Sequence, residues 1–137
     1  FLFAWTSASA ANNGLARTPP MGWRSWNAFD ININQEIMQS MMDRMTERVR
    51  LVDGVPTSLL DLGYNDCGLD DGWQDAGAGV NGSYHDADGH PLINKSKFPD
   101  MKAMTSYGHQ RKLTVGWYMN NCNPHEPKSE EPGYEAK

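Results

Sequence analysis

The sequence predicts an α/β fold with a parallel sheet, because three short apolar segments alternate with two helical patterns. The predicted strands run from Met21 to Trp26, from Asp66 to Asp71 and from Leu113 to Tyr118. The stretches between them are long enough for the crossover connections that parallel strands require. Composition alone permits either an open doubly wound sheet or a (β/α)8 barrel.

The first predicted helix follows the first strand. Its apolar residues recur at three- and four-residue spacing, which is typical of one buried helix face: Ile37, Met38, Met41, Met42, Met45 and Val49. Asn32 or Asn34 is placed to cap its start. Methionines at this spacing indicate a flexible apolar core face rather than a cofactor or metal site.

A turn is predicted between Leu51 and Ser58, where Asp53-Gly54 and Pro56 interrupt the helical region. The next segment, Leu59 to Tyr64, is interpreted as a helix end, because Gly63 stands in the usual C-terminal position.

A long loop is predicted over residues 75–97, which contain four glycines among several Asp and Asn residues. The run His85 to His90 within it is typical of a β-turn. Phe98-Pro99-Asp100 closes the loop and opens a second helix, which carries Met101, Met104 and Tyr107 on one face.

Charge and hydropathy exclude two classes of partner. The formal net charge is −5, and Lys and Arg are scattered without a basic stripe, which argues against nucleic acid. No apolar run approaches the ~20 residues that span a bilayer.

Both ends of the sequence suggest a piece of a secreted protein. Residues 1–10 resemble a signal-peptide remnant, since Ala8-Ser9-Ala10 fits the cleavage pattern; an N-terminal arm is the alternative. Two Asn-x-Ser sequons, at Asn81 and Asn94, suit secretion or an endomembrane or lysosome-like lumen. Residues 126–137 have the composition of a loop, and a chain that stops in a loop suggests a fragment; a disordered tail on a complete small domain is the alternative.

The cysteines and histidines indicate no metal site. Cys67 lies inside a predicted strand and Cys122 lies beyond the end of another, which places them too far apart to form a disulfide within one parallel sheet. Cys67 is therefore predicted to be a buried thiol. The four histidines lack the spacing of metal ligands and are interpreted as surface residues.

Two tryptophan motifs carry most of the functional information: Pro20-Met21-Gly22-Trp23-Arg24-Ser25-Trp26-Asn27-Ala28-Phe29 and Leu69-Asp70-Asp71-Gly72-Trp73-Gln74. In each, an aromatic ring stands beside carboxylate or amide groups, which suits the C–H face and the hydroxyls of a sugar. From about Gly14 to Cys122 the chain resembles the opening of glycoside hydrolase family 27, the α-galactosidase family of carbohydrate metabolism.

The resemblance implies a (β/α)8 barrel, of which this chain would hold the first three β/α units. Such a barrel needs about 250 residues and carries its chemistry at the carboxyl ends of its strands. Residues 11–137 are then expected to be a partial N-terminal catalytic barrel domain.

The resemblance implies a substrate-binding role for Trp26, Asp70, Asp71 and Tyr118, which stand at the ends of the predicted strands. Each has a structural alternative: packing for Trp26, capping of the following turn for an aspartate, and a rim position bonded to backbone for Tyr118. Trp73 is expected either to extend the aromatic wall or to pack under the long loop.

No catalytic residue is expected in this chain. Neighbouring aspartates cannot flank a scissile bond from opposite sides, as glycosidase carboxylates do. The family's nucleophile and acid/base follow later strands, which nothing here matches. The resemblance implies a retaining exo-glycosidase that releases terminal α-galactose from an oligosaccharide or glycoconjugate, with no metal or organic cofactor. Alternatives are a non-catalytic carbohydrate-binding remnant, or action on α-N-acetylgalactosamine or β-L-arabinopyranose.

The resemblance also bears on disulfides. It implies that Cys122 pairs with a cysteine outside this chain. A second family bridge is expected to be absent, because Ile31 and Gly72 stand near its two positions.

Overall fold

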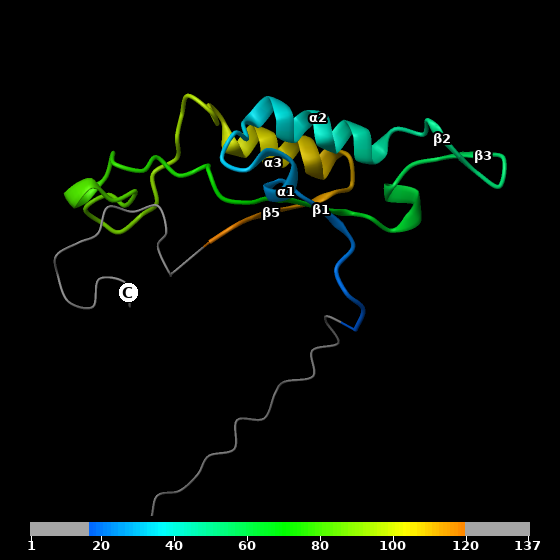
Figure 1. The fold of residues 1–137 in the computed structure, drawn as a ribbon, viewed down its shortest axis with the longest axis horizontal. Coiled ribbons are helices and arrows are strands. Elements are labelled where there is room, and N and C mark those ends of the chain that lie inside the picture. Colours follow the sequence, from blue (N-terminus) through cyan, green and yellow to red (C-terminus); the bar gives the residue numbers. More distant parts are fainter. Residues whose placement is uncertain (1–16, 120–137) are drawn as a thin grey trace, which may run out of the picture.

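The computed structural model describes residues 17–119, and Figure 1 shows how they are arranged. Three strands form a parallel sheet in the order β1-β4-β5: β1 (Gly22–Arg24), β4 (Asp66–Leu69) and β5 (Thr114–Trp117). The three predicted strands and their parallel pairing are therefore confirmed, although each strand is shorter than predicted.

The first strand ends before Trp26, so the prediction that it extends to this residue is wrong. Trp26 instead begins the short helix α1 (Trp26–Phe29). The reason is local: the carbonyl of Ser25 accepts the backbone N–H groups of Ala28 and Phe29, which turns the chain away from the sheet.

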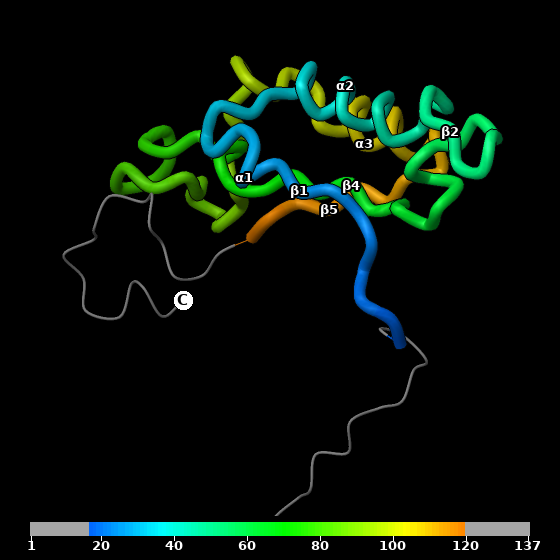
Figure 2. The backbone as a smooth tube through the Cα atoms, turned by 45° about the vertical axis from the view of Figure 1, so that its right-hand side comes forward, coloured from blue at the N-terminus to red at the C-terminus, as the bar shows by residue number. Residues whose placement is uncertain are grey.

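Two longer helices, α2 (Gln35–Thr46) and α3 (Met101–Gln110), lie on the same side of the sheet (Figure 2). Each begins at a side-chain cap, since the carboxamide of Asn34 accepts the N–H of Ile37 and the carboxylate of Asp100 accepts the N–H of Ala103. Of the two residues predicted to cap the first helix, Asn34 is the one that does so.

The core lies between the sheet and these helices. Side chains of a strand alternate between its faces, and Cys67 and Leu69 of β4 point into the core. The helices contribute mainly methionines to it, as predicted: Met38, Met42, Met45, Met101 and Met104. Cys67 is fully buried, which confirms its prediction.

The other face of the sheet carries a polar cluster that joins all three strands. The Arg24 guanidinium lies 2.6 Å from the carboxylate of Asp66, and the Thr114 hydroxyl donates to the same carboxylate at 3.0 Å. Gly68 makes room for this pair, because a side chain there would occupy the position of the Arg24 side chain. Both α2 and α3 lie on the opposite side of the sheet (Figure 2).

A hairpin connects α2 to the second strand of the sheet. Its antiparallel strands β2 (Arg50–Val52) and β3 (Val55–Thr57) flank a turn at Asp53 and Gly54. The predicted turn is confirmed, whereas the two strands beside it were not predicted. A single 3-10 turn, η1 (Leu60–Leu62), follows and ends at Gly63, as the sequence indicates.

Residues 75–97 form the long connection that the glycines predict, with only a 3-10 turn, η2 (Val80–Gly82), and two isolated bridges. It lies at the opposite end of the molecule from the hairpin (Figure 1). Cys122, the sequence before residue 17 and the predictions for both lie outside the described residues.

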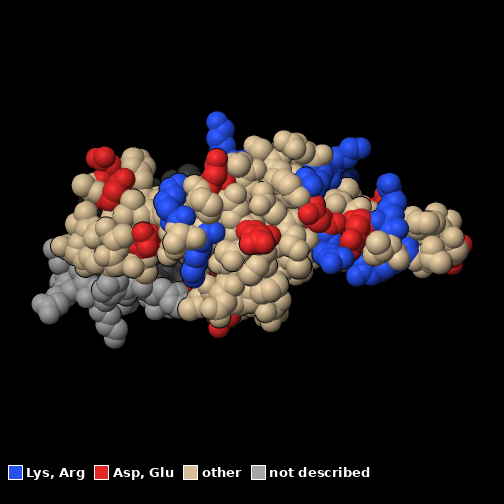
Figure 3. Space-filling model, turned by 90° about the horizontal axis from the view of Figure 1, so that it is seen from above, with Lys and Arg blue, Asp and Glu red and all other residues tan. Residues whose placement is uncertain are grey.

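The surface agrees with the charge pattern of the sequence. On the face seen in Figure 3, Lys and Arg are interspersed with Asp and Glu. Among residues 17–119, no helix has the length and apolar character needed to cross a membrane.

Candidate functional site

The four residues predicted to bind substrate follow the carboxyl ends of the three parallel strands. Trp26 lies two residues after β1, Asp70 and Asp71 directly follow β4, and Tyr118 directly follows β5. Parallel strands end at the same edge of a sheet, so the fold brings these residues to one edge. The sequence separation between the first and the last of them is more than ninety residues.

Backbone hydrogen bonds fix the three strand ends to one another. The N–H of Ser25 donates to the Gly68 carbonyl at 3.2 Å, and the N–H of Asp70 donates to the Ser25 hydroxyl at 2.8 Å. On the other side of β4, the N–H of Tyr118 donates to the Leu69 carbonyl at 2.8 Å. The segments that carry the four residues are therefore tied together directly.

Asp70 and Asp71 occupy different environments although they are adjacent. One oxygen of Asp70 accepts the N–H of Asp71, and one oxygen of Asp71 accepts the N–H of Gly72, each at 2.8 Å. Both side chains thus cap the turn after β4. Asp71 is only 7% exposed, whereas Asp70 is partly exposed and its Oδ2 has no hydrogen-bond partner among the residues that the structure describes. Asp70 therefore has acceptor capacity left for a ligand hydroxyl.

The turn after Asp71 approaches the end of α1 closely. Gly72 has a φ of +100°, and a Cβ atom there would lie 3.0 Å from the Cα of Ile31. The Lys97 ammonium donates to the carbonyl oxygens of Ile31 at 2.8 Å and of Gly72 at 3.5 Å. The family resemblance places a disulfide near these two positions, and here a lysine side chain connects them.

The tryptophans near this edge differ in what they offer. Trp26 is 37% exposed, so part of its ring surface is available for contact. Trp73 is 1% exposed and its Nε1–H donates to the Tyr118 carbonyl at 3.0 Å, so it packs beneath the loop rather than forming a wall.

Trp117 is an aromatic residue at this edge that the sequence did not single out. Its ring centroid lies 5.7 Å from that of Trp73, and 39% of the residue is exposed. Its position as the last residue of β5, directly before Tyr118, is the signal that could have identified it.

A hollow of about 310 Å³ lies elsewhere, between the start of α2 and residues 96–99. Two of its polar side chains are engaged in the fold, since Asn34 caps α2 and the carboxamide oxygen of Gln35 accepts the N–H of Asp100. None of the four predicted site residues lines it.

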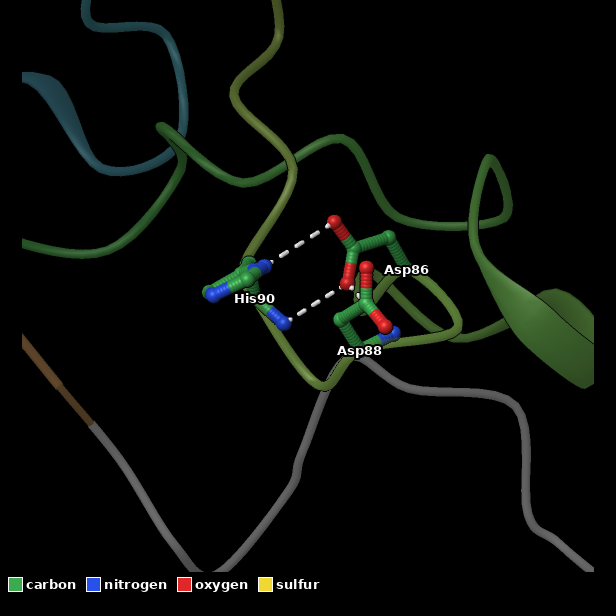
Figure 4. A group of neighbouring side chains, drawn as sticks. All are labelled: Asp86, Asp88 and His90. Atoms are coloured by element: carbon green, nitrogen blue, oxygen red, sulfur yellow. Dashed lines mark hydrogen bonds and ion pairs between the residues drawn. The ribbon is translucent and has the colours of Figure 1, made fainter.

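The three histidines within residues 17–119 lie away from the strand ends: His85 and His90 are in the long loop, and His109 is in α3. His90 lies in the long loop beside Asp86 and Asp88, and the three offer ligand atoms within 4.8 Å of one another (Figure 4). The Asp86 carboxylate accepts the N–H groups of His90 and Asp88, which lowers the pKa of Asp86, and its Oδ2 lies 3.3 Å from His90 Nδ1. Asp86, Asp88 and His90 are therefore held together by the hydrogen bonds that close this turn of the loop.

The comparisons with known proteins point to α-galactosidases. The chain is 38% identical over 114 residues to an α-galactosidase of Cyamopsis tetragonoloba, a match that spans 82% of this chain and 24% of that protein. No protein-family model matches the chain.

Solved structures give the same result. α-Galactosidase I of Mortierella vinacea has a TM-score of 0.63 at 30% identity, over 79% of this chain and 23% of that chain. The Saccharomyces cerevisiae α-galactosidase MEL1 has a TM-score of 0.62 at 29% identity, over 81% of this chain and 21% of that chain. A family 27 β-L-arabinopyranosidase of Geobacillus stearothermophilus, at 20% identity and a TM-score of 0.59, shares the fold. The chain thus spans about a quarter of the length of its relatives.

Proposed function

Because this chain is related to the α-galactosidases of glycoside hydrolase family 27, we propose that it contributes the sugar-binding wall of a retaining exo-glycosidase. The proposed substrate is a terminal α-linked galactose of an oligosaccharide or glycoconjugate. The observation that carries the proposal is the convergence of Trp26, Asp70, Asp71 and Tyr118 at the carboxyl edge of one parallel sheet.

The chemistry of these side chains supports a sugar ligand. An ionised carboxylate accepts hydrogen bonds only, and Asp70 keeps one oxygen available for a hydroxyl. The exposed part of the Trp26 ring offers an apolar surface for the C–H face of a hexose. Asp71 is nearly buried and accepts the Gly72 N–H, so its proposed role is to hold the turn after β4 and to contact the sugar at the innermost part of the site.

The proposal assigns the two catalytic carboxylates to sequence outside this chain. A retaining glycosidase places its nucleophile and its acid/base on opposite sides of the scissile bond, about 5–5.5 Å apart. Asp70 and Asp71 are consecutive residues whose carboxylates cap the same turn, so they bind sugar rather than form this pair.

We also propose a barrel architecture for the chain and a cellular location for the protein. The parallel order β1-β4-β5, with helices on one face, supports the first units of a (β/α)8 barrel over residues 11–137. Residues 1–10 are proposed to be the remnant of a secretory signal peptide, which places the enzyme outside the cell or in an endomembrane lumen.

Galactose titration of the full chain tests the binding role. We expect galactose to perturb the tryptophan fluorescence with saturation. The variants Asp70→Asn and Trp26→Ala should each weaken binding about tenfold or more, since a hydrogen bond to a charged group contributes about 1.5–3 kcal/mol. Asp88→Asn, in an exposed turn of the long loop, serves as the control that leaves affinity unchanged.

Two outcomes would contradict the proposal. One is a chain that is folded but gives no response to galactose; the other is wild-type affinity in Asp70→Asn. Hydrolysis of p-nitrophenyl α-galactoside by the chain alone would contradict the placement of the catalytic carboxylates. Parallel titrations with N-acetylgalactosamine and β-L-arabinopyranose distinguish the alternative substrates.

A carbohydrate-binding protein without catalysis is the second candidate, because the adjacent carboxylates Asp70 and Asp71 cannot act as a catalytic pair. A transcript whose reading frame continues past Lys137 into further strands would favour the enzyme. A mature message that stops there would favour the binding protein.

A further inference from the structure

Ser25 lies fully buried where β1, α1 and the end of β4 meet. Three of its polar groups bind three different segments. Its N–H donates to the Gly68 carbonyl at 3.2 Å, its carbonyl accepts the Phe29 N–H at 3.0 Å, and its hydroxyl oxygen accepts the Asp70 N–H at 2.8 Å.

The hydroxyl replaces a backbone acceptor that β1 no longer supplies. The ladder between β1 and β4 ends at the pair Arg24 and Gly68, because the chain turns into α1 immediately afterwards. The N–H of Asp70 lies beyond that last pair, and a partly buried N–H without an acceptor would be costly. The Ser25 side chain satisfies it, and in doing so it fixes where the Asp70 backbone lies.

We propose that Ser25 is a positioning residue that sets the geometry between Trp26 and Asp70 in the sugar-binding site. Trp26 follows Ser25 directly and starts the helix that the Ser25 carbonyl initiates, while Asp70 is held by the hydroxyl of the same residue. The inference rests on the proposed sugar-binding function, and it adds a residue that touches no ligand itself.

The chain offers a matched control in Ser58. Ser58 is 2% exposed, and its hydroxyl accepts the Asp61 N–H at 3.0 Å and donates to the Asp61 carboxylate at 2.7 Å. It lies between β3 and η1, away from the strand ends that carry the site. Loss of this buried hydroxyl should therefore affect stability without affecting the site.

The test compares the full chain with the variants Ser25→Ala and Ser58→Ala. We expect both to lower the melting temperature, because each leaves a backbone N–H without its acceptor. Galactose affinity should fall by about fivefold to tenfold in Ser25→Ala alone, the effect of about one hydrogen bond. The Asp70 amide should also lose protection from hydrogen exchange in that variant, whether or not galactose is present.

Two further variants separate the hydroxyl from the volume it fills, and they serve if Ser25→Ala fails to fold. Ser25→Thr keeps the oxygen and should retain both Asp70 amide protection and galactose affinity. Ser25→Cys keeps a side chain of similar size but offers sulfur, a weak acceptor, and should behave like Ser25→Ala.

The results distinguish a failure of the Ser25 positioning role from a failure of the proposed sugar binding. Wild-type protein that is folded but has no galactose affinity contradicts the proposed function, and the inference with it. Wild-type protein that binds galactose, together with Ser25→Ala or Ser25→Cys that binds equally well with a protected Asp70 amide, contradicts the inference alone. An equal loss of affinity in Ser58→Ala would also overturn it, because the effect would then follow stability.

Discussion

At the scale of single residues, burial separates side chains that the sequence presents as equivalent. Asp70 and Asp71 are adjacent acids, yet Asp70 is partly exposed with one oxygen that no residue of the described range 17–119 engages, and Asp71 is 7% exposed. Both stand after the last residue of β4, directly before the turn at Gly72, whose φ is +100°. A sequence pattern identifies the pair but not this division of roles.

Cys67 gives a prediction that depends mainly on its burial, with a smaller contribution from the nearby Asp66 carboxylate. Its burial raises the pKa of the thiol to about 12, so the unreactive thiol form dominates at neutral pH. In a Cys122→Ser background, we expect Cys67 to react with iodoacetamide far more slowly at pH 8 in the native protein than in denaturant. The folded state retains this proton, so stability should fall as the pH rises from about 8.5 toward 12.

Measuring native and denatured reaction rates side by side, and the melting temperature from pH 8 to 11, checks both statements. A native rate equal to the denatured rate would show that Cys67 is accessible. A melting temperature that rises over that pH range would contradict the direction of the shift.

At the scale of elements, the strength of the local signal decides what the sequence could predict. The helix of residues 35–46 has an apolar stripe and a capping asparagine, and both are found. The prediction that Val49 belongs to this stripe is wrong, because the helix ends at Thr46 and Val49 is 67% exposed. Helix α1 has only four residues, too few for a periodic pattern, so its start at Trp26 was missed. The hairpin strands β2 and β3 are almost entirely exposed, so they show no alternation of buried and exposed residues, and only their turn was visible.

Individual side-chain contacts across long stretches of sequence could not be predicted from the sequence. The bond from Lys97 to the carbonyl of Ile31 spans 66 residues, and nothing in either local pattern indicates it. The absence of a cysteine pair at positions 31 and 72 was recognised, but the lysine that connects these positions was not. The grouping of the four site residues could be predicted because parallel order alone brings strand ends together.

Lys97 accordingly gives a prediction for the loops that it connects. Lys97→Met keeps an apolar stem but removes the donor to Ile31 and Gly72, and should lower the free energy of unfolding by about 1–2 kcal/mol. Lys97→Arg should retain most of this stability, and Lys95→Met, at an exposed neighbour, should have little effect. Denaturant melts measure all three, and equal stability of Lys97→Met and Lys95→Met would refute the role of the ammonium.

At the scale of the whole molecule, the described part of the chain leaves much of its sheet uncovered. β1 and β5 each pair only with β4, and the face that carries Arg24, Asp66 and Thr114 lies opposite both long helices (Figure 2). The hairpin adds exposed apolar residues at one end of the molecule: Leu51, Val52 and Val55. Open strand edges pair readily with other chains.

The chain made alone should therefore associate or remain partly disordered. We expect light scattering to detect oligomers at micromolar concentration, and a hydrophobic dye to bind before any thermal transition. A compact monomer at micromolar concentration would contradict this, and it would also count against the proposed partial barrel. Lys or Glu introduced at Leu51 and Val55 should reduce association if the hairpin drives it, and should leave it unchanged if the sheet does.

The neighbourhood of Gly68 constrains how this protein can diverge. The Arg24 side chain occupies the space that any residue larger than glycine would need, and it holds Asp66 from there. A mutation that enlarges residue 68 would displace the Arg24 guanidinium and remove its ion pair with Asp66, and the Thr114 hydroxyl would remain as a hydrogen-bond donor to that carboxylate. Larger residues at position 68 are therefore expected only together with a rearranged or shorter side chain at position 24.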